Sequence, residues 1–331
     1  MKLRLPAEWE EQEALIVVFP PKKSDWAHSI EAIHQTYLTL ISTVARFQPC
    51  IVVCEDKQHL ANILPTLQNI TLVEMLTNDT WIRDFGGINV YKNHQRRTYD
   101  FIFNAWGNKF DASIDNMITK RLFEEGFLKG KLKSIDFVLE GGSIESNGHG
   151  VMLSTAYCLF EENRNAHLSK KEIKKTLIKL FGLKELIILK HGALMGDDTD
   201  SHIDTLARFL NKNTIAYVKC YDKEDEHYDE LKKMEKELKK TSFDLVPLPL
   251  PSAKFFNDHR LPATYLNFIL VNNAVLVPLY NDAYDTKALK TFARYFPERE
   301  IVGIDASVLI REHGSLHCAS MNIYKKKDNL S

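Results

Sequence analysis

Short apolar runs recur throughout the chain, and this recurrence most limits what the chain can fold into. The runs are rich in Val, Ile and Leu and are bounded by Pro, Gly, Asn or Asp, so they predict β-strands. Between several of them the apolar residues follow helical spacing, and Ser169 with Glu172 predicts a capping box. Strands that alternate with helices predict an α/β fold. The predicted strands include Leu15–Phe19, Ile51–Cys54, Ile88–Tyr91, Val151–Leu153, Leu186–Leu189, Ile215–Val218, Phe268–Val271, Val275–Pro278 and Ile301–Ile304, and the predicted helices are Ser29–Phe47, Ser169–Phe181, Lys223–Lys240 and Asp282–Phe296.

The domain organisation follows from the length of the chain and from its lack of a linker. A chain of 331 residues fits one large domain or two ordinary ones. No stretch is rich in Pro, Gly or Ser, and the most irregular piece, Pro247–Pro251, is short enough to be an extended loop. The strands hint at a repeat of about 60 residues, but self-similarity in the sequence is too weak to prove one. We therefore expect a single domain over residues 1–331.

Composition excludes several classes of function. The formal net charge is -1, so neither nucleic acid nor a membrane surface is an expected partner. The N-terminal residues lack the apolar stretch of a secretory signal, and no run approaches the roughly 20 apolar residues of a transmembrane helix. The five cysteines are scattered and odd in number, which indicates free thiols in a reducing cytoplasm. The sequence leaves the oligomeric state open, and a homo-oligomer is compatible with it.

Two polar segments punctuated by glycine lie beside predicted strands. Asn78–Gly87, which contains Asp84, comes directly before a strand, and functional side chains gather in such loops. Val138–Ser143 places Glu140 before two glycines, which allow a ligand to approach the backbone closely. Taken alone, each segment is better explained as an ordinary turn.

Two further segments carry the residue types of acid–base and nucleophilic chemistry. Gly196–Asp204 holds four aspartates and His202, a composition compatible with a metal site, an acid–base centre or an Asp-rich loop. On a strand, His202 and Asp204 would point to the same face. Glu312–Ser320 holds Cys318 beside Gly and His, so Cys318 is a candidate nucleophile, although alone it is better explained as a buried inert cysteine.

Together these segments resemble the agmatine deiminase family, which is related to the bacterial-type peptidylarginine deiminases. The resemblance covers nearly the whole chain, and no single motif carries it. The matching motifs follow one another in family order: Leu5–Glu10, Glu13–Ala14, Asn78–Gly87, Phe103–Gly107, Leu139–Ser143, Glu162–Asn165, Asp198–Asp204, Leu206–Phe209, Leu261–Phe268, Val277–Leu279 and Leu316–Cys318.

The resemblance implies a fold and a set of roles. The implied fold is the pentein-type α/β propeller, with five ββαβ units around a pseudo-fivefold axis and the site in the central channel. Cys318 resembles the nucleophile of the family, and His202 resembles its general acid and base. Asp84 and Asp204 resemble the pair that binds the guanidinium, and Glu140 resembles a further carboxylate near the leaving nitrogen and His202.

Three more residues are expected in the substrate channel. Trp81 and Trp106 resemble its walls, with ordinary core packing as the alternative. Asp198 is a candidate for binding the amine of agmatine, and a loop-stabilising role explains it equally well. The chain departs from the family at Asn108, where Gly is frequent, and in Glu312–Ser315, where a run of glycines is common. These departures bear on loop geometry and substrate fit more than on the type of reaction.

The chemistry of a guanidinium explains why these residue types suit the predicted reaction. Two carboxylates can accept its N–H groups, a thiolate can attack its central carbon, and one histidine can serve both half-reactions. The expected activity is hydrolysis of agmatine to N-carbamoylputrescine and ammonia through a thiouronium on Cys318, with no metal or other cofactor. Deimination of free or peptidyl arginine is one alternative, and a non-catalytic binding protein for cationic amines is another. A cysteine amidase fits less well, because an amide carbonyl calls for oxyanion-hole donors rather than several carboxylates.

Overall fold

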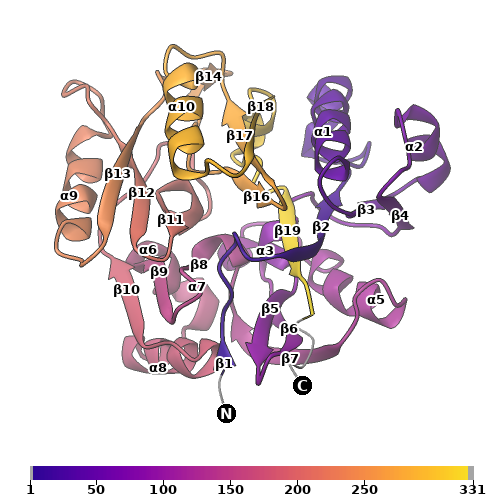
Figure 1. Cartoon of the computed structure of the whole chain (residues 1–331), viewed down its shortest axis with the longest axis horizontal. Helices are drawn as coiled ribbons and strands as arrows, with labels where there is room; N and C mark the ends of the chain where they lie inside the picture. Colours follow the sequence, from indigo (N-terminus) through magenta and orange to yellow (C-terminus); the bar gives the residue numbers. More distant parts are fainter. Residues whose placement is uncertain (1–2, 327–331) are drawn as a thin grey trace.

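The structure, a computed structural model, describes residues 3–326 and has the alternating strands and helices that the sequence predicts (Figure 1). Its strands are β1 (Leu3–Arg4), β2 (Gln12–Val18), β3 (Cys50–Cys54), β4 (Ile70–Glu74), β5 (Ile88–Lys92), β6 (Gln95–Ile102), β7 (Lys131–Val138), β8 (Glu145–Ser146), β9 (Val151–Thr155), β10 (Glu185–Leu189), β11 (Ala207–Asn211), β12 (Thr214–Lys219), β13 (Asp244–Pro249), β14 (Phe255–Phe256), β15 (His259–Arg260), β16 (Ile269–Val271), β17 (Ala274–Leu279), β18 (Glu300–Asp305) and β19 (Ser320–Tyr324). Its helices are α1 (Ile30–Ala45), α2 (Lys57–Ile63), α3 (Ile82–Phe85), α4 (Ala105–Asn108), α5 (Ile118–Glu124), α6 (Ala156–Leu159), α7 (Glu162–Asn165), α8 (Lys170–Phe181), α9 (Tyr228–Leu238) and α10 (Asp285–Tyr295). The 3₁₀ turns are η1 (Asp25–Ser29), η2 (Asp115–Met117), η3 (Gly141–Ser143), η4 (Ile203–Thr205) and η5 (Leu309–Glu312).

One pattern of strand pairing repeats in five sheets of the described chain. In each sheet an antiparallel pair is followed by a strand that joins in parallel: β5–β6 then β7, β8–β9 then β10, β11–β12 then β13, β16–β17 then β18, and β19–β2 then β3 and β4. Strand β1 adds to β5, and β14 and β15 form a separate ribbon. Parallel neighbours require a crossover, and α5, α8, α9, α10, α1 and α2 lie within the six crossovers of these sheets.

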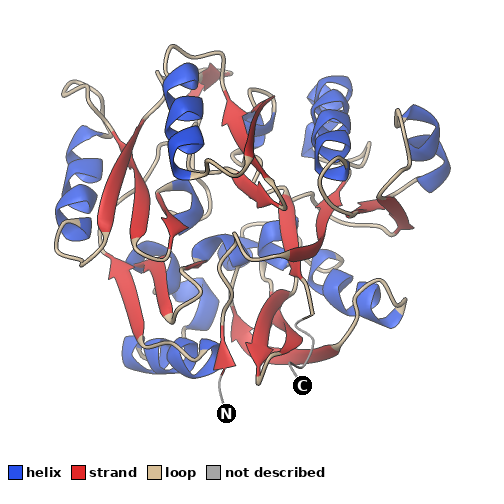
Figure 2. Ribbon diagram, viewed as in Figure 1, coloured by secondary structure: helices blue, strands red, loops and turns tan. Residues whose placement is uncertain are grey.

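The longer helices α1, α8, α9 and α10 lie at the periphery, whereas the short helix α3 lies near the middle of the molecule (Figure 2). Helix α9 is highly charged, yet it buries Leu231, Met234 and Leu238, the apolar stripe that predicts this helix. Helix α8 begins with the predicted capping box, in which Ser169 and Glu172 bond each other's backbone N–H groups. Among the described residues, none of the helices combines the length and the apolar character of a membrane-spanning segment.

Strands from the two ends of the described chain lie side by side. β19 pairs antiparallel with β2, from Ser320 opposite Val17 to Tyr324 opposite Gln12, and Figure 1 shows the yellow strand beside the indigo one. Because Cys318 comes just before β19, this pairing fixes the C-terminal segment that carries the predicted nucleophile.

The prediction of a loop at Pro247–Pro251 is wrong for most of its length. Pro247 and Pro249 lie in β13, which runs parallel to β12. Strand β13 is the outer strand of its sheet, and proline is tolerated in an outer strand because its missing N–H need not serve the ladder.

Candidate active site

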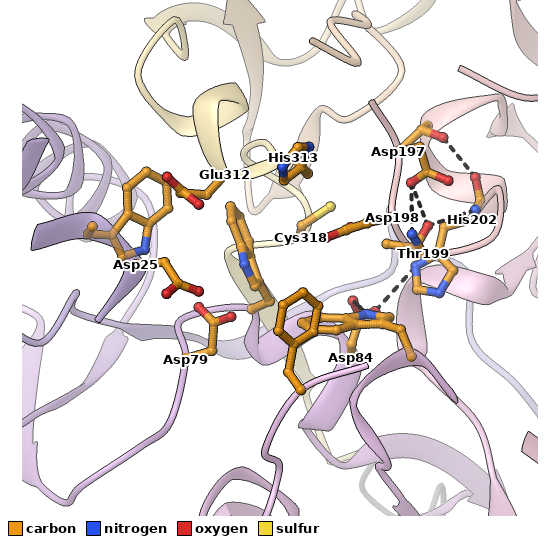
Figure 3. Close-up of a pocket in the computed structure, with 16 residues that line it drawn as sticks. Asp25, Asp79, Asp84, Asp197, Asp198, Thr199, His202, Glu312, His313 and Cys318 are labelled. Atoms are coloured by element: carbon orange, nitrogen blue, oxygen red, sulfur yellow. Dashed lines mark hydrogen bonds and ion pairs between the residues drawn. The ribbon is translucent and has the colours of Figure 1, made fainter. Parts of the chain in front are cut away.

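A cavity at the ends of several strands gathers most of the predicted site residues. The turn before β5 contributes Trp81 and Asp84, and the segment before β19 contributes Cys318. Figure 3 shows the Cys318 sulfur with Asp79 on one side and His202 on the other. The residues that line the cavity are Asp25, Trp26, Asp79, Trp81, Asp84, Trp106, Phe110, Asp197, Asp198, Thr199, His202, Thr205, Glu312, His313, Gly314 and Cys318.

The Cys318 thiol is buried against a carboxylate. Cys318 is 6% exposed, and its sulfur accepts a hydrogen bond from Asn267 Nδ2 at 3.3 Å. Asp204 Oδ2 lies 3.8 Å from the same sulfur. Burial raises the pKa of Cys318 well above its ordinary value, and the charges of Asp204 and Asp84 raise it further. Burial and these negative charges therefore favour the protonated thiol.

Both oxygens of Asp84 are held by N–H donors. The backbone N–H of Gly142 donates to Oδ1 at 2.9 Å, and Trp106 Nε1 donates to Oδ2 at 2.9 Å. Burial raises the pKa of Asp84 to about 6, while the neighbouring His202 acts in the opposite direction. Trp106 also lines the cavity, so the same side chain borders the cavity and holds this carboxylate.

A left-handed turn carries Trp106. The four residues of α4 have φ values of 51° at Ala105, 53° at Trp106, 90° at Gly107 and 63° at Asn108. Asn is one of the few residues with a side chain that occupies this region readily, which explains how Asn108 can replace the family's frequent glycine. Such backbone strain persists only where the surroundings fix it, and it is typical of functional sites.

Gly142 leaves open the point at which three site residues converge. A Cβ at this position would lie 2.6 Å from His202 Nδ1, 2.9 Å from Asp84 Oδ1 and 3.1 Å from Asp204 Oδ2. Each of these distances is shorter than ordinary van der Waals contact, so the arrangement of the three side chains requires glycine here.

His202 is fully buried beside Asp84, with Nδ1 3.6 Å from Asp84 Oδ1. Within residues 3–326 neither of its ring nitrogens has a hydrogen-bond partner. Burial opposes its protonation, but Asp84, Cys158 and Glu140 together raise the pKa of His202 well above its ordinary value. The segment is not a strand: the chain forms the tight turn η4 here, with His202 at its start and Asp204 within it.

Asp204 does not line the cavity wall but lies directly behind the sulfur. It is 0% exposed, its Oδ2 accepts a hydrogen bond from His317 Nδ1 at 2.7 Å, and its Oδ1 has no partner within the described chain. Burial would raise the pKa of Asp204, but the hydrogen bond from His317 and the charges of His317, His202 and Arg208 lower it below its ordinary value. Asp204 is therefore an ionised carboxylate with one oxygen still available.

Glu140 lies against His202 rather than on the cavity wall. Its Oε1 accepts a hydrogen bond from Arg164 Nε at 2.8 Å, and its Oε2 lies 3.9 Å from the sulfur of Cys158. The ligand atoms of Glu140, Cys158 and His202 lie within 4.8 Å of one another, so these three residues are candidate ligands for a metal ion, and their donor types are ones that Zn²⁺ accepts.

The lining of the cavity is acidic. Asp198 lines it, together with Asp25, Asp79 and Glu312. Burial raises the pKa of Asp79 to about 7, and the charges of Asp25 and Asp198 act in the same direction. Trp81 forms a wall between this region and the core, packing on Trp26 with ring centroids 5.7 Å apart.

Several residues that complete the site are not predicted from the sequence. Arg164 binds Glu140, and it also holds the loop before His202 through Asp200 Oδ2 at 2.7 Å and the Thr199 carbonyl at 3.0 Å. Arg164 could have been predicted from its place in the matching motif Glu162–Asn165. His317 could have been predicted only from its position next to Cys318, and no feature of the sequence around Cys158 indicates a role for that residue.

Comparison with known proteins shows the family. Residues 4–323 match the family described as Porphyromonas-type peptidyl-arginine deiminase. The chain belongs to this family. An agmatine deiminase of Pseudomonas aeruginosa is 29% identical, with 95% of this chain and 94% of that protein covered. The predicted resemblance to agmatine deiminases is thereby confirmed.

Solved structures agree with this assignment. A Cys-to-Ser variant of C. jejuni agmatine deiminase with substrate bound is 46% identical, with a TM-score of 0.96 and coverage of 98% of this chain and 97% of that one. An Enterococcus faecalis agmatine deiminase is 26% identical, with a TM-score of 0.90 and coverage of 98% and 96%. An amidinotransferase of Microseira wollei, 13% identical with a TM-score of 0.58 over 99% of both chains, shares the fold alone. The mixed α/β fold is thus the one shared by pentein deiminases and amidinotransferases.

Proposed function

We propose that this protein hydrolyses the guanidinium of agmatine to give N-carbamoylputrescine and ammonia. The observation that carries the proposal is one cavity that contains the thiol of Cys318, the imidazole of His202 and the carboxylate of Asp84, with Asp204 behind the sulfur. A planar cation suits this set of groups, because carboxylates accept its N–H donors while the sulfur faces its carbon. The agmatine deiminases of P. aeruginosa, C. jejuni and E. faecalis support agmatine as the substrate.

The proposed reaction has two halves. Asp84 and Asp204 bind the guanidinium, whose positive charge favours the Cys318 thiolate. The sulfur bonds to the guanidinium carbon, and the C–N bond breaks as His202 gives a proton to the departing ammonia. His202 then takes a proton from water, the oxygen bonds to the thiouronium carbon, and the C–S bond breaks to release the ureido product and the thiol. Glu140 supports this cycle from behind His202 by favouring its protonated form.

The remaining predicted residues have proposed roles in binding. Trp81 and Trp106 enclose the alkyl chain of the substrate, and Asp198 receives its distal amine. Asp79, which also lines the cavity, adds to the preference for a second positive charge. A free arginine would bring its α-carboxylate to this region, where like charges repel.

The organisation of the whole chain belongs to the same proposal. Residues 1–331 form one catalytic domain, and its five sheets surround a pseudo-fivefold axis as five ββαβ units; both ends of that range lie outside the described residues. The five cysteines are free, which supports a reducing cytoplasm.

Ammonia release from agmatine, free arginine and a peptidylarginine, measured side by side with the purified protein, tests the proposal. We expect agmatine to be the best substrate and a chelator to leave its turnover intact. Cys318→Ser is expected to bind agmatine without releasing ammonia. Binding of agmatine without turnover by the unaltered protein would instead support a binding protein, and preferential turnover of arginine would support the other deiminases.

A further inference from the structure

The residue next to the nucleophile has a side chain that leaves the cavity. His317 is 2% exposed and lies among the residues of a second, separate cavity, with Glu8, Glu145 and Arg83 as charged neighbours. Its backbone is held independently of its ring, because Asn267 Oδ1 accepts the N–H of His317 at 2.9 Å and that of Cys318 at 3.2 Å. The ring therefore does not hold the Cys318 backbone in place.

Both nitrogens of the His317 ring face carboxylates. Nδ1 lies 2.7 Å from Asp204 Oδ2, and Nε2 lies 2.8 Å from Glu8 Oε2. A neutral imidazole has a single N–H, so it can satisfy only one of two ionised carboxylates. The geometry is that of an imidazolium that donates at both ends.

Glu8 is ionised, which supports this charge state. Burial opposes ionisation, but Arg208 and His317 hold the pKa of Glu8 well below its usual range. Arg208 forms an ion pair with Glu8, and its Nε lies 3.3 Å from Glu145 Oε2. Glu8 therefore lies between His317 and a guanidinium that is always charged. Charges thus alternate from Arg208 through Glu8 and His317 to Asp204, all of them buried.

We propose that His317 is a positioning residue, an imidazolium that keeps Asp204 ionised and leaves its Oδ1 free to bind the substrate cation. This inference rests on the proposed function, in which Asp204 binds the guanidinium. Four groups besides His317 act on Asp204: His202 and Arg208 favour its ionised form, whereas Asp84 is a like charge and the thiol of Cys318 lies 3.8 Å away. Without the imidazolium, burial and the negative charge of Asp84 would favour a neutral Asp204.

The test compares the pH dependence of kcat/KM for His317→Gln with that of the unaltered enzyme. We expect kcat/KM for agmatine to fall about tenfold or more near neutral pH, with most of the loss in KM. The ratio to the unaltered enzyme should recover as the pH rises, because hydroxide then removes the proton from Asp204. A ratio that stays constant over the whole pH range overturns the proposal, since a purely structural role lowers activity at every pH alike.

Two controls separate the proposal from general damage. His191→Gln makes the same change in a histidine that also lies near two carboxylates, Glu230 at 3.2 Å and Glu237 at 3.9 Å, but at the surface, so its pH profile should not change. Glu8→Gln should shift the profile in the same direction as His317→Gln, by less, because an amide oxygen still accepts from Nε2.

A measurement on the unaltered protein decides the charge state even if the variants fail to fold. In ¹⁵N-histidine NMR at neutral pH, both ring nitrogens of His317 should carry protons, because each of them faces a carboxylate oxygen. A neutral ring overturns the inference. Because this readout needs no substrate, its failure is distinguishable from a failure to find deiminase activity.

Discussion

Substitution of Gly142 by alanine provides the sharpest test of the proposed site. The new methyl group would lie 2.6 Å from His202 Nδ1, about 0.8 Å closer than the 3.4 Å at which ordinary contact begins. Asp84 is held by Gly142 and Trp106, and Asp204 is held by His317, so His202 has to give way. A misplacement of about 1 Å costs roughly a hundredfold in rate, and we expect kcat to fall by about that factor.

The folding cost of Gly142→Ala should be much smaller than its effect on activity. Overpacking a buried site costs about 1–3 kcal/mol, so the variant should remain folded at room temperature. Thermal unfolding measured beside the initial rate of ammonia release separates the two effects. In the control Gly303→Ala, the three atoms nearest to the new methyl group all belong to the flexible side chain of Leu279, and kcat of this variant should equal that of the unaltered enzyme. If Gly142→Ala keeps more than about half of the original kcat, the convergence of these three side chains is not needed for turnover.

Two further predictions concern Asp84. Trp106→Phe removes the 2.9 Å hydrogen bond to Asp84 Oδ2 but keeps an aromatic wall, so KM for agmatine should rise about tenfold with a smaller change in kcat; unchanged KM would contradict the orienting role. The pKa of Asp84 is about 6 in the free enzyme, and its charged form exists above that value, so kcat/KM should fall as the pH falls through about 6. A profile that stays flat down to about pH 5 would show that an ionised Asp84 is not required.

Local patterns predicted the secondary structure well because they reflect how each segment is buried. The apolar run Ile51–Cys54 lies in β3, which is fully buried. The apolar residues Leu231, Met234 and Leu238 form the buried face of α9. β13 was missed because its prolines suggest a loop, and only the sheet shows that this strand lies at an edge. A sequence pattern thus predicts whether a segment is buried, but it does not predict which strand that segment pairs with.

The family resemblance predicted which residues belong to the site, whereas only the structure shows which side chains contact them. Cys318, His202 and Asp84 were predicted and meet in one cavity. The contact of His317 with Glu8 joins residues far apart in the chain, and no spacing rule links them. The convergence on Gly142 was also inaccessible to sequence reasoning, because it depends on distances below 3.4 Å between side chains from different turns.

The pairing of β19 with β2 has a consequence for the order in which the enzyme acquires its chemistry. Asp84, Glu140, His202 and Asp204 all precede Cys318 in the chain, so a growing polypeptide carries the acids and the imidazole before it carries the sulfur. The sulfur reaches them only when β19 docks beside a strand made near the start of synthesis. A chain interrupted between Asp204 and Cys318 would hold the carboxylates and the imidazole without the nucleophile, so incomplete molecules cannot form the thiouronium.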